Sequence, residues 1–272
     1  MSGDLYWANV VLLCGFEGSD ASTSFDDEST PNHTLTAVGN AQIDTAQFKF
    51  GSSSALFDGT GDGITTPDSA DWDLSDANSD QFTVETWVRF NSLTGEQSLV
   101  SQWATSNLSW HIRKLTTHEI QFGWTFNNSG VLTVVTSGAS LATDTWYHIA
   151  VDKDATGKIR FYVDGVMRGS STPSNSTIYN SATVLTIGGE SNGTARILNG
   201  WLDEVRITKG VARYASDSGY TVPVAAFERG GVTAGRAKVW SGSAWAVKPA
   251  KVWSGSAWAE KPVKVWNGSA WA

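Results

Sequence analysis

The sequence predicts an all-β protein, an antiparallel β-sandwich or jelly roll followed by a small tail of β-hairpin repeats. Apolar and polar residues alternate along many short segments from residue 10 to about residue 207, which is the period of a strand with one buried face. Turns rich in Gly, Asn, Asp and Ser separate these segments. A 13-residue unit recurs at the C-terminus. We expect at most one helical turn, near residues 211–215.

Eleven segments have the pattern of strands: Val10–Phe16, Ser54–Asp58, Phe82–Phe90, Ser98–Trp103, Leu108–Lys114, Glu119–Phe126, Val131–Thr136, Trp146–Asp152, Lys158–Asp164, Thr183–Ile187 and Gly200–Ile207. Short strands at this spacing are typical of a sandwich. In the segment at 82–90 the even-numbered residues form a core face, and Trp87 lies on the other face. That face is therefore either covered or carries an exposed aromatic. Asp164-Gly165 predicts a tight hairpin turn.

Charge divides the 272 residues into two parts. Residues 1–228 carry 12 basic and 26 acidic side chains, a net of −14, whereas residues 229–272 carry seven basic and one acidic, a net of +6. We therefore expect a sandwich domain (1–228), a linker (229–236) and a repeat tail (237–272). An alternative is that the tail lysines only keep a Trp-rich segment soluble. The overall net charge of −8 argues against nucleic acid as a partner.

Cysteine usage and the N-terminus bear on the compartment. Cys14 is the single cysteine, so no internal disulfide can form, and its apolar surroundings predict a buried thiol. The first nine residues lack basic residues and a long apolar core, so we expect them to be neither a signal peptide nor a membrane span. We expect a protein made in a reducing cytoplasm.

An ordered series of segments carries a family resemblance. The series is Val11-Leu12-Leu13 with Phe16-Glu17-Gly18, then Phe50–Gly59, Gly61-Asp62-Gly63, Phe82–Val88, Trp146–Val151, Arg160–Gly165 and Gly200–Ile207. Across about residues 5–228 it resembles the concanavalin A-like, laminin-G-like jelly-roll family. With Thr36–Ile43 it resembles more narrowly the modules of bacteriophage structural proteins. The wider family contains glycan binders, protein binders, scaffolds and some glycosidases, so the fold does not fix the function.

A glycosidase site needs two carboxylates a few ångströms apart. The glycosidases of this family space them E-x-D-x-E on one strand, and no segment here has that spacing. Asp203 and Glu204 are adjacent, so we expect them on opposite faces of a strand. The four histidines have no flanking nucleophile in a recognisable motif; they are His33, His111, His118 and His148. The prediction is that the protein is not an enzyme.

The resemblance also implies a structural calcium ion at one rim of the sandwich. Asp26 or Asp27, in the loop after the first strand, and Asp203, on a late strand, are the candidate ligands, because Ca²⁺ prefers carboxylate oxygens from several loops. The alternative is that these side chains solvate a loop or form a salt bridge.

A glycan site would need exposed aromatic rings beside hydrogen-bonding groups. Trp103, Trp110 and Trp124 lie on the middle strands, close in sequence to Asn127, and these four are the candidate glycan-binding residues. The alternative, which we favour, is that these tryptophans fill the core of a large sandwich.

The tail repeats at 237–249, 250–262 and 263–272 predict three β-hairpins, with Ser241-Gly242, Ser254-Gly255 and Asn267-Gly268 as two-residue turns. In that register Trp240 lies opposite Ser243, and Lys238 lies opposite Trp245. A single hairpin is marginally stable in water, so we expect the tryptophan faces to be covered by neighbouring repeats, other chains or a partner. The residues expected in oligomerisation or docking are Trp240, Trp245, Trp253, Trp258, Trp266 and Trp271.

Together with the phage resemblance, these features favour a non-enzymatic structural protein of a phage particle, on the capsid or on the tail and its fibres. It would be made in the bacterial cytoplasm and incorporated into the virion with other virion proteins, as a homo-oligomer that analogy suggests is a trimer. The alternative function is an adhesin that binds a host polysaccharide. No nucleic acid, no membrane and no cofactor beyond calcium are expected.

Overall fold

The computed structural model describes residues 3–231 and, in the tail, the backbone of four strands at 237–240, 245–248, 251–253 and 258–260. The chain divides into two units. One is Ala8–Phe227, and the other combines Met1–Trp7 with Glu228–Ala272. Within the smaller unit, the Asp4 amide donates to the Gly230 carbonyl at 2.9 Å.

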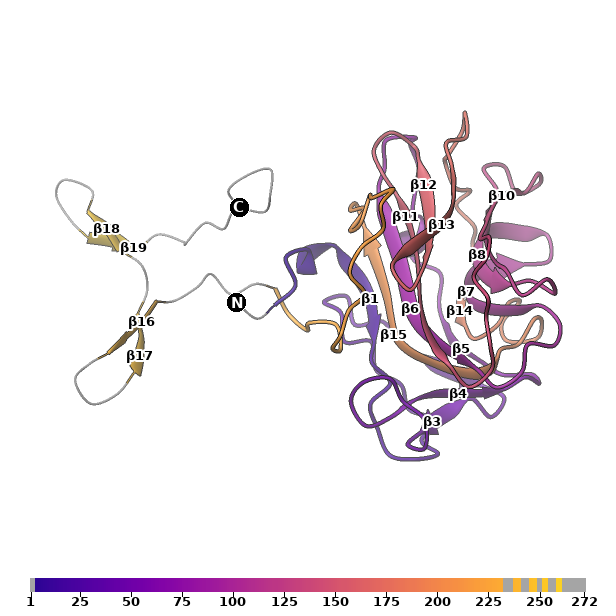
Figure 1. Cartoon of the computed structure of the whole chain (residues 1–272), viewed down its shortest axis with the longest axis horizontal. Helices are drawn as coiled ribbons and strands as arrows, with labels where there is room; N and C mark the ends of the chain where they lie inside the picture. Colours follow the sequence, from indigo (N-terminus) through magenta and orange to yellow (C-terminus); the bar gives the residue numbers. More distant parts are fainter. Residues whose placement is uncertain (1–2, 232–236, 241–244, 249–250, 254–257, 261–272) are drawn as a thin grey trace. The chain divides into compact units, whose positions relative to one another are not determined.

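The larger unit is a sandwich of two antiparallel sheets that pack face to face (Figure 1). The eight-stranded sheet contains β1 (Val10–Cys14), β3 (Gln42–Asp44), β4 (Ser54–Asp58), β6 (Phe82–Phe90), β11 (Trp146–Lys153), β12 (Ile159–Val163), β13 (Val166–Ser171) and β15 (Asn199–Lys209). Its order is β13-β12-β11-β6-β15-β4-β3, with β1 also paired to β15.

The seven-stranded sheet has the order β10-β9-β8-β7-β14-β5-β2. Its strands are β2 (Thr36–Val38), β5 (Gly63–Thr66), β7 (Gln97–Ala104), β8 (Asn107–Lys114), β9 (Ile120–Trp124), β10 (Leu132–Val135) and β14 (Leu185–Ile187). All eleven expected strands are confirmed, and β4 and β6 have the expected bounds. The strand β13 was not among the eleven, but it pairs with β12 across the predicted turn at Asp164-Gly165. The short strands β2, β3 and β5 were not predicted.

The expected helical turn near residues 211–215 is wrong, because Ala215 has a φ of 42° and the segment is irregular. The helical elements of the described residues are two single 3-10 turns, Trp7–Asn9 and Ala70–Trp72. The Ser69 side chain caps the second turn by accepting from the Asp71 amide. None of the described helices is long or apolar enough to cross a membrane.

The core between the sheets is built from the inward-facing residues of both. On β6, Phe82, Val84, Val88 and Phe90 are buried in it, as the alternation predicts. Trp72 lies between the sheets, and the indole of Trp110 on β8 donates to its carbonyl at 3.1 Å. Burying side chains of this kind contributes about 1.5–3 kcal/mol each.

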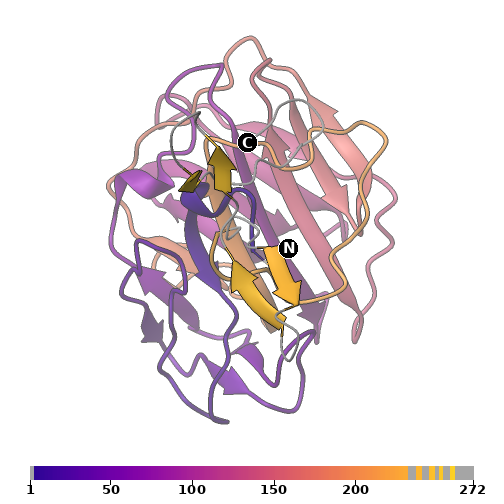
Figure 2. The same cartoon turned by 90° about the vertical axis from the view of Figure 1, so that its left-hand side faces the viewer.

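A second buried layer covers the outer face of the eight-stranded sheet. Residues 211–227, which we call the strap, cross this face, as the orange segment of Figure 2 shows. The amides of Tyr214 and Ala215 donate to Asp152 on β11, at 3.2 and 2.5 Å. The ring of Tyr220 stacks on that of Tyr214 at 3.5 Å. Trp87, on the same face, is buried beside Phe50, Lys49 and His148, which agrees with the covered surface that the sequence allowed.

Two repeats of the tail form antiparallel pairs, β16 (Ala237–Trp240) with β17 (Trp245–Lys248) and β18 (Lys251–Trp253) with β19 (Trp258–Glu260). The expected register is wrong: Trp240 pairs with Trp245, and Lys238 pairs with Val247. A four-residue connection therefore replaces the two-residue turn, which makes the two tryptophans direct cross-strand partners. The third repeat, with Trp266 and Trp271, lies outside the described residues.

Candidate functional site

The outer face of the seven-stranded sheet carries the best candidate site. Residues 179 and 189 accept hydrogen bonds from Ser109 and Ser101 on part of this face, and Trp103, Arg113 and Gln121 are partly exposed on it. On β8, Trp110 and Ile112 point into the core, so His111 and Arg113 point outward. The same alternation on β9 turns Gln121 outward, directly opposite Arg113. Trp103 follows a bulge near the end of β7.

An aromatic platform forms the first half of this site. The ring of Trp103 is partly exposed and stands edge-on to His111, with the ring centroids 4.5 Å apart. The imidazole Nε2 lies 3.2 Å from the Gln121 side-chain oxygen. Gly123 makes room for the imidazole, because a Cβ there would meet His111 Nε2 at 2.4 Å. The buried imidazole thus fixes the indole on one side and the amide on the other.

A cluster of two arginines and two glutamates forms the second half. Arg196 donates to Glu96 at 2.7 Å and to Glu190 at 2.8 Å, so its guanidinium bridges the two carboxylates. Arg113 NH1 lies 3.8 Å from Glu96 and 3.7 Å from Glu190. These distances are too long for hydrogen bonds, and Arg113 makes none with any residue that the structure describes.

Three buried polar atoms of the site lack a partner: His111 Nδ1, Arg113 Nε and Glu190 Oε1. Folded proteins pair most of their buried polar atoms, so each of these favours a bound water or ligand nearby. Burial, followed by the charge of Arg113, lowers the pKa of His111 to about 3. The imidazole is therefore neutral at pH 7, and Nδ1 is an acceptor if the proton is on Nε2.

The two glutamates of the cluster have opposite pKa shifts. Burial raises the pKa of Glu190. Burial acts in the same direction on Glu96, but the hydrogen bond from Arg196 and the charge of Arg113 outweigh it and lower its pKa. Glu190 is completely buried and Glu96 is about one-third exposed, at 32%. Glu96 is therefore the carboxylate that a ligand can reach.

The structure places the four expected glycan-binding residues in different environments. Trp103 lies at the site. Trp110 and Trp124 are core residues, as the favoured alternative predicted, so their candidate role in glycan binding is corrected. They face inward because each alternates with an outward polar neighbour on its strand. Asn127 is exposed in the turn after β9, where its side-chain oxygen accepts from Thr125 and Ser129.

The residues that sequence reasoning did not assign to this site are His111, Arg113, Gln121, Glu96 and Glu190. The alternation of β8 and β9 would have turned His111, Arg113 and Gln121 outward. Nothing in the sequence pairs Glu96 with Glu190, because the two residues meet through Arg196 and Arg113, which come from other parts of the chain.

Two of the three expected calcium ligands accept hydrogen bonds from backbone amides. Asp26 is exposed, whereas the buried Asp27 carboxylate accepts from the amides of Leu13, Ser29 and His33 at 2.8–3.0 Å. Asp203 Oδ2 accepts from the amides of Lys49 and Phe50. Among the described residues, no group of three His, Cys, Asp or Glu side chains could hold a metal ion. These donors do not form a cation cage here, and calcium binding stays a prediction from the resemblance.

The expectation that Asp203 and Glu204 lie on opposite faces is wrong. A bulge follows Asp203, and Glu204 has a φ of 53°, which interrupts the strand alternation. Glu204 accepts from the Phe227 amide at the end of the strap, on the face that also holds Trp87. Burial raises the pKa of Asp203 to about 7, and the charge of Glu204 adds to the shift. Both carboxylates are buried, so neither is placed for catalysis.

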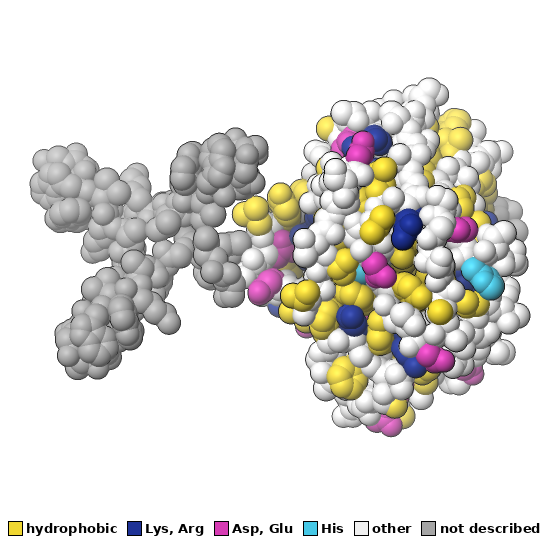
Figure 3. Space-filling model, in the orientation of Figure 1, with side chains coloured by type: hydrophobic (Ala, Val, Ile, Leu, Met, Phe, Trp, Pro, Cys, Tyr) yellow, Lys and Arg dark blue, Asp and Glu magenta, His cyan; other side chains and the backbone are white. Residues whose placement is uncertain are grey.

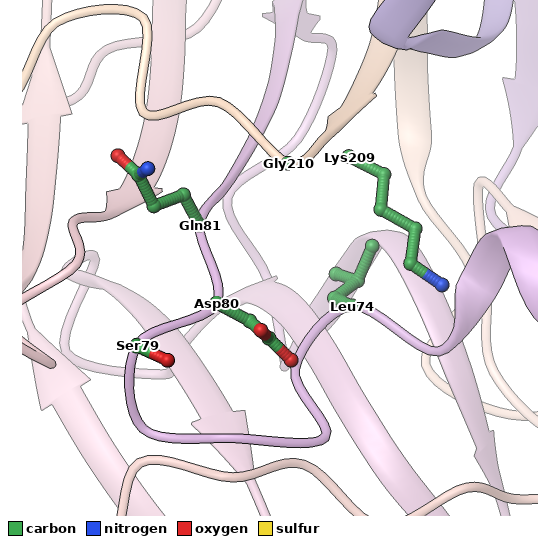
Figure 4. A pocket seen from close by; sticks show the side chains of 6 residues that line it. All are labelled: Leu74, Ser79, Asp80, Gln81, Lys209 and Gly210. Carbon is green, nitrogen blue, oxygen red and sulfur yellow. The ribbon is translucent and has the colours of Figure 1, made fainter.

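A cavity of about 340 Å³ lies at one end of the eight-stranded sheet (Figure 4). It is lined by Leu74, Ser79, Asp80, Gln81, Lys209 and Gly210. Its charged groups already have partners: Lys209 Nζ donates to the Ala70 carbonyl, and Asp80 accepts from two backbone amides of its own loop. The cavity is therefore a weaker candidate than the site formed by Trp103, His111, Gln121 and the cluster of Arg113, Arg196, Glu96 and Glu190, which we call the Trp103 site.

Exposed apolar side chains do not indicate a further docking surface. The large hydrophobic residues that are exposed on the sandwich include Phe48, Phe126 and Val166. On the face that Figure 3 shows, hydrophobic side chains are scattered among polar and charged ones. Single exposed hydrophobics are normal on a soluble protein surface.

Comparison with known proteins agrees with this architecture. Residues 58–215 match the model of the concanavalin A-like lectin/glucanases superfamily. This match covers more than half of the chain, which therefore belongs to that superfamily. No curated protein matches the chain in sequence.

Solved structures share the fold at low identity. The binding domain of Paraclostridial Mosquitocidal Protein 1 is 18% identical with a TM-score of 0.59, and the match covers 78% of this chain and 51% of that one. The binding domain of Botulinum neurotoxin DC matches twice. Its complex with rat synaptotagmin II has a sequence identity of 15% and a TM-score of 0.58. Its complex with SialylT has a sequence identity of 14% and a TM-score of 0.55. Both cover 75% of this chain and 48% of that one, so the chain spans about half the length of these structures.

Proposed function

We propose that the sandwich is a non-catalytic carbohydrate-binding module that recognises a surface glycan through the Trp103 site. The observation that carries this proposal is a partly exposed indole beside polar side chains that a ligand can reach, the Gln121 amide, Arg113 and Glu96. Sugars present an apolar ring face and a rim of hydroxyls. An aromatic ring with a few fixed polar groups is the complement of that surface.

The polar groups of the site are held in place before any ligand arrives. Gln121 is oriented by His111, and its amide nitrogen donates to no other described residue. Glu96 and Glu190 are held by Arg196. Such preorganisation reduces the entropy that binding must overcome.

Two further points support binding rather than hydrolysis. The similar structures are binding domains by their titles, one of them in complex with SialylT. In this chain the Arg196 guanidinium lies between the two carboxylates of the site, where a glycosidic bond would have to sit for a pair of carboxylates to cleave it.

A glycan array with the full chain tests the proposal. We expect binding to a subset of bacterial surface oligosaccharides, at least tenfold weaker for Trp103→Ala. Phe48→Ala, which removes an exposed ring from the β3–β4 loop, is the matched control and should bind as wild type. Binding that is unaffected by Trp103→Ala would refute the site. Release of reducing ends from a bound glycan would refute the non-catalytic assignment.

The setting that we propose for this module is the surface of a phage particle, on the capsid or the tail. The resemblance to phage structural modules supports it, as does the contrast between an acidic sandwich and a basic tail of repeated hairpins. The tail would join copies of the chain or dock to another virion protein. A chain ending at Phe227 should then sediment with fewer copies per particle than the full chain, and an unchanged number of copies would contradict a role of the tail in joining them. Electron microscopy of virions with antibody-labelled protein tests the location.

A further inference from the structure

In the charged half of the Trp103 site, the guanidinium of Arg113 lies just beyond hydrogen-bond distance of two carboxylates, and we call this separation the gap. Arg113 NH1 is 3.8 Å from Glu96 Oε2 and 3.7 Å from Glu190 Oε1. Each distance is about 1 Å longer than a charge-assisted hydrogen bond. A polar contact of this length is commonly bridged by a third group. Arg113 is 16% exposed, so that group can come from solvent or from a ligand.

The chemistry of the gap selects the bridging group. Arg113 can only donate, and an ionised Glu96 can only accept. A group that joins them must accept from the guanidinium and donate to the carboxylate. A hydroxyl or a water does both, whereas a carboxylate, sulfate or phosphate only accepts.

The surrounding charge points the same way. The positive charges of Arg113 and Arg196 are balanced by Glu96 and Glu190, and Arg196 is already hydrogen-bonded to both glutamates. The sandwich segment as a whole has a net charge of −14, from 12 basic and 26 acidic residues. An anionic group brought to Arg113 would therefore lie beside two carboxylates, and like charges in close contact are unfavourable.

Resting on the proposed carbohydrate function, we infer that the site selects neutral sugars, with a hydroxyl bridging Arg113 and Glu96 while an apolar ring face lies on Trp103. The outward side chains of Arg113 and His111 are one alternation apart on β8, about 7 Å. The ring of His111 carries Trp103, so the platform and the bridge are neighbours along one strand. The free amide of Gln121 lies beside Arg113 and can donate to a second hydroxyl.

The test compares neutral and acidic glycans of matched structure on the full chain. The array is read for neutral and uronic or sialic acid-containing oligosaccharides. Solution affinities follow by calorimetry with a neutral oligosaccharide and its C6-carboxylate counterpart of the same length, such as galactose and galacturonate oligomers. We expect the neutral member to bind at least about tenfold more tightly, the effect of one charge-assisted hydrogen bond.

Variants connect this preference to the gap. Arg113→Met should weaken the affinity for the neutral oligosaccharide about tenfold or more. Glu96→Gln keeps an acceptor but removes a negative charge, so it should narrow the neutral-to-acidic ratio at least threefold, mainly by improving acidic binding. Phe48→Ala should leave the ratio unchanged. Thermal melting checks that each variant is folded.

The outcomes separate the two proposals. Acidic oligosaccharides that bind more tightly than their neutral counterparts, or a ratio that Glu96→Gln does not change, would overturn the neutral-sugar inference and leave carbohydrate binding standing. Absence of binding to every glycan on the array would overturn both.

Discussion

The two outer faces of the sandwich each place an arginine beside a buried glutamate, and the two pairs differ in one respect. On the eight-stranded sheet, Arg206 donates to Glu85 at 2.9 and 2.7 Å, and Phe227 of the strap lies 3.7 Å from its guanidinium. On the seven-stranded sheet, Arg113 lies 3.7 Å from Glu190, makes no side-chain hydrogen bond to a described residue and is 16% exposed. The first pair is complete within the chain, whereas the second leaves hydrogen-bonding capacity for a ligand.

The difference shows that burial of charge alone does not mark a functional site. The covered face also contains buried atoms without partners, such as Trp87 Nε1 and Asp203 Oδ1. These atoms lie beneath the loop that carries Lys49, whose ammonium is 4.0 Å from the Trp87 ring. Access distinguishes the two faces, because a ligand can reach Arg113 and Trp103 without displacing a segment of the chain.

The largest expected effect is the loss of the completed pair. Glu85→Gln removes the carboxylate charge that lies 2.7 Å from Arg206 and 3.8 Å from Arg213, and it removes the ionised acceptor of Tyr214. Removing one member of a buried ion pair costs about 3–5 kcal/mol. Urea denaturation should show a loss of that size in the free energy of unfolding. A loss below about 1 kcal/mol would mean that the strap network does not stabilise the fold.

The next effect concerns the dependence of stability on pH. The pKa of Asp203 is raised to about 7, mainly by burial. The folded protein holds this proton more tightly than the unfolded chain, so the stability from Asp203 is present below pH 4 and is lost as pH rises through 7. Asp203→Asn should remove that loss, on the order of 3–4 kcal/mol between pH 4 and 8. Parallel curves of unfolding free energy against pH for wild type and variant would contradict the buried carboxyl.

A smaller effect is expected at the platform of the open face. Gly123→Ala places a methyl group against the His111 imidazole, and overpacking of this kind costs about 1–2 kcal/mol. The same change should weaken glycan binding, because His111 orients both Trp103 and Gln121. Gly130→Ala is the matched control, since a Cβ there meets nothing within 4 Å. Equal stability of the two variants would show that the imidazole is not fixed by Gly123.

The smallest effect should come from the incomplete pair. Glu190→Gln removes a charge whose Oε1 has no partner, while Arg196 keeps its bond to Glu96. We expect a stability change of about 1 kcal/mol or less, because both arginines retain access to solvent. Glu190→Gln and Glu85→Gln are the same chemical change on the two faces. Similar losses in the free energy of unfolding for both variants would contradict the distinction between the two faces.

Much of the sandwich was predictable because its strands are long and regular. The segment at 82–90 alternates over nine residues, so both its bounds and its core face follow from the sequence. The strands β2, β3 and β5 have only three or four residues, and an alternation that short is indistinguishable from a loop. In the tail, the Ser-Gly pairs indicated a turn, but loop length decides hairpin register, and composition did not reveal a four-residue connection.

The site was less predictable, because it depends on contacts between distant segments. Trp103, Trp110 and Trp124 looked equivalent in the sequence, yet the strand phase places two in the core and leaves one at the surface. Arg113 meets Glu96 and Glu190 only because β7 lies between β8 and β14. The bulge after Asp203 reverses the face of Glu204, and no local signal announced it.

The most direct test of the central claim is a titration of the uniformly ¹⁵N-labelled full chain with a glycan that the array identifies. The indole N–H resonance of Trp103 is assigned as the one that disappears in Trp103→Phe. We predict that this resonance shifts during the titration, whereas the core indoles of Trp110 and Trp124 stay in place. Saturable binding that leaves the Trp103 resonance unmoved would place the ligand elsewhere on the molecule and contradict glycan binding at the Trp103 site.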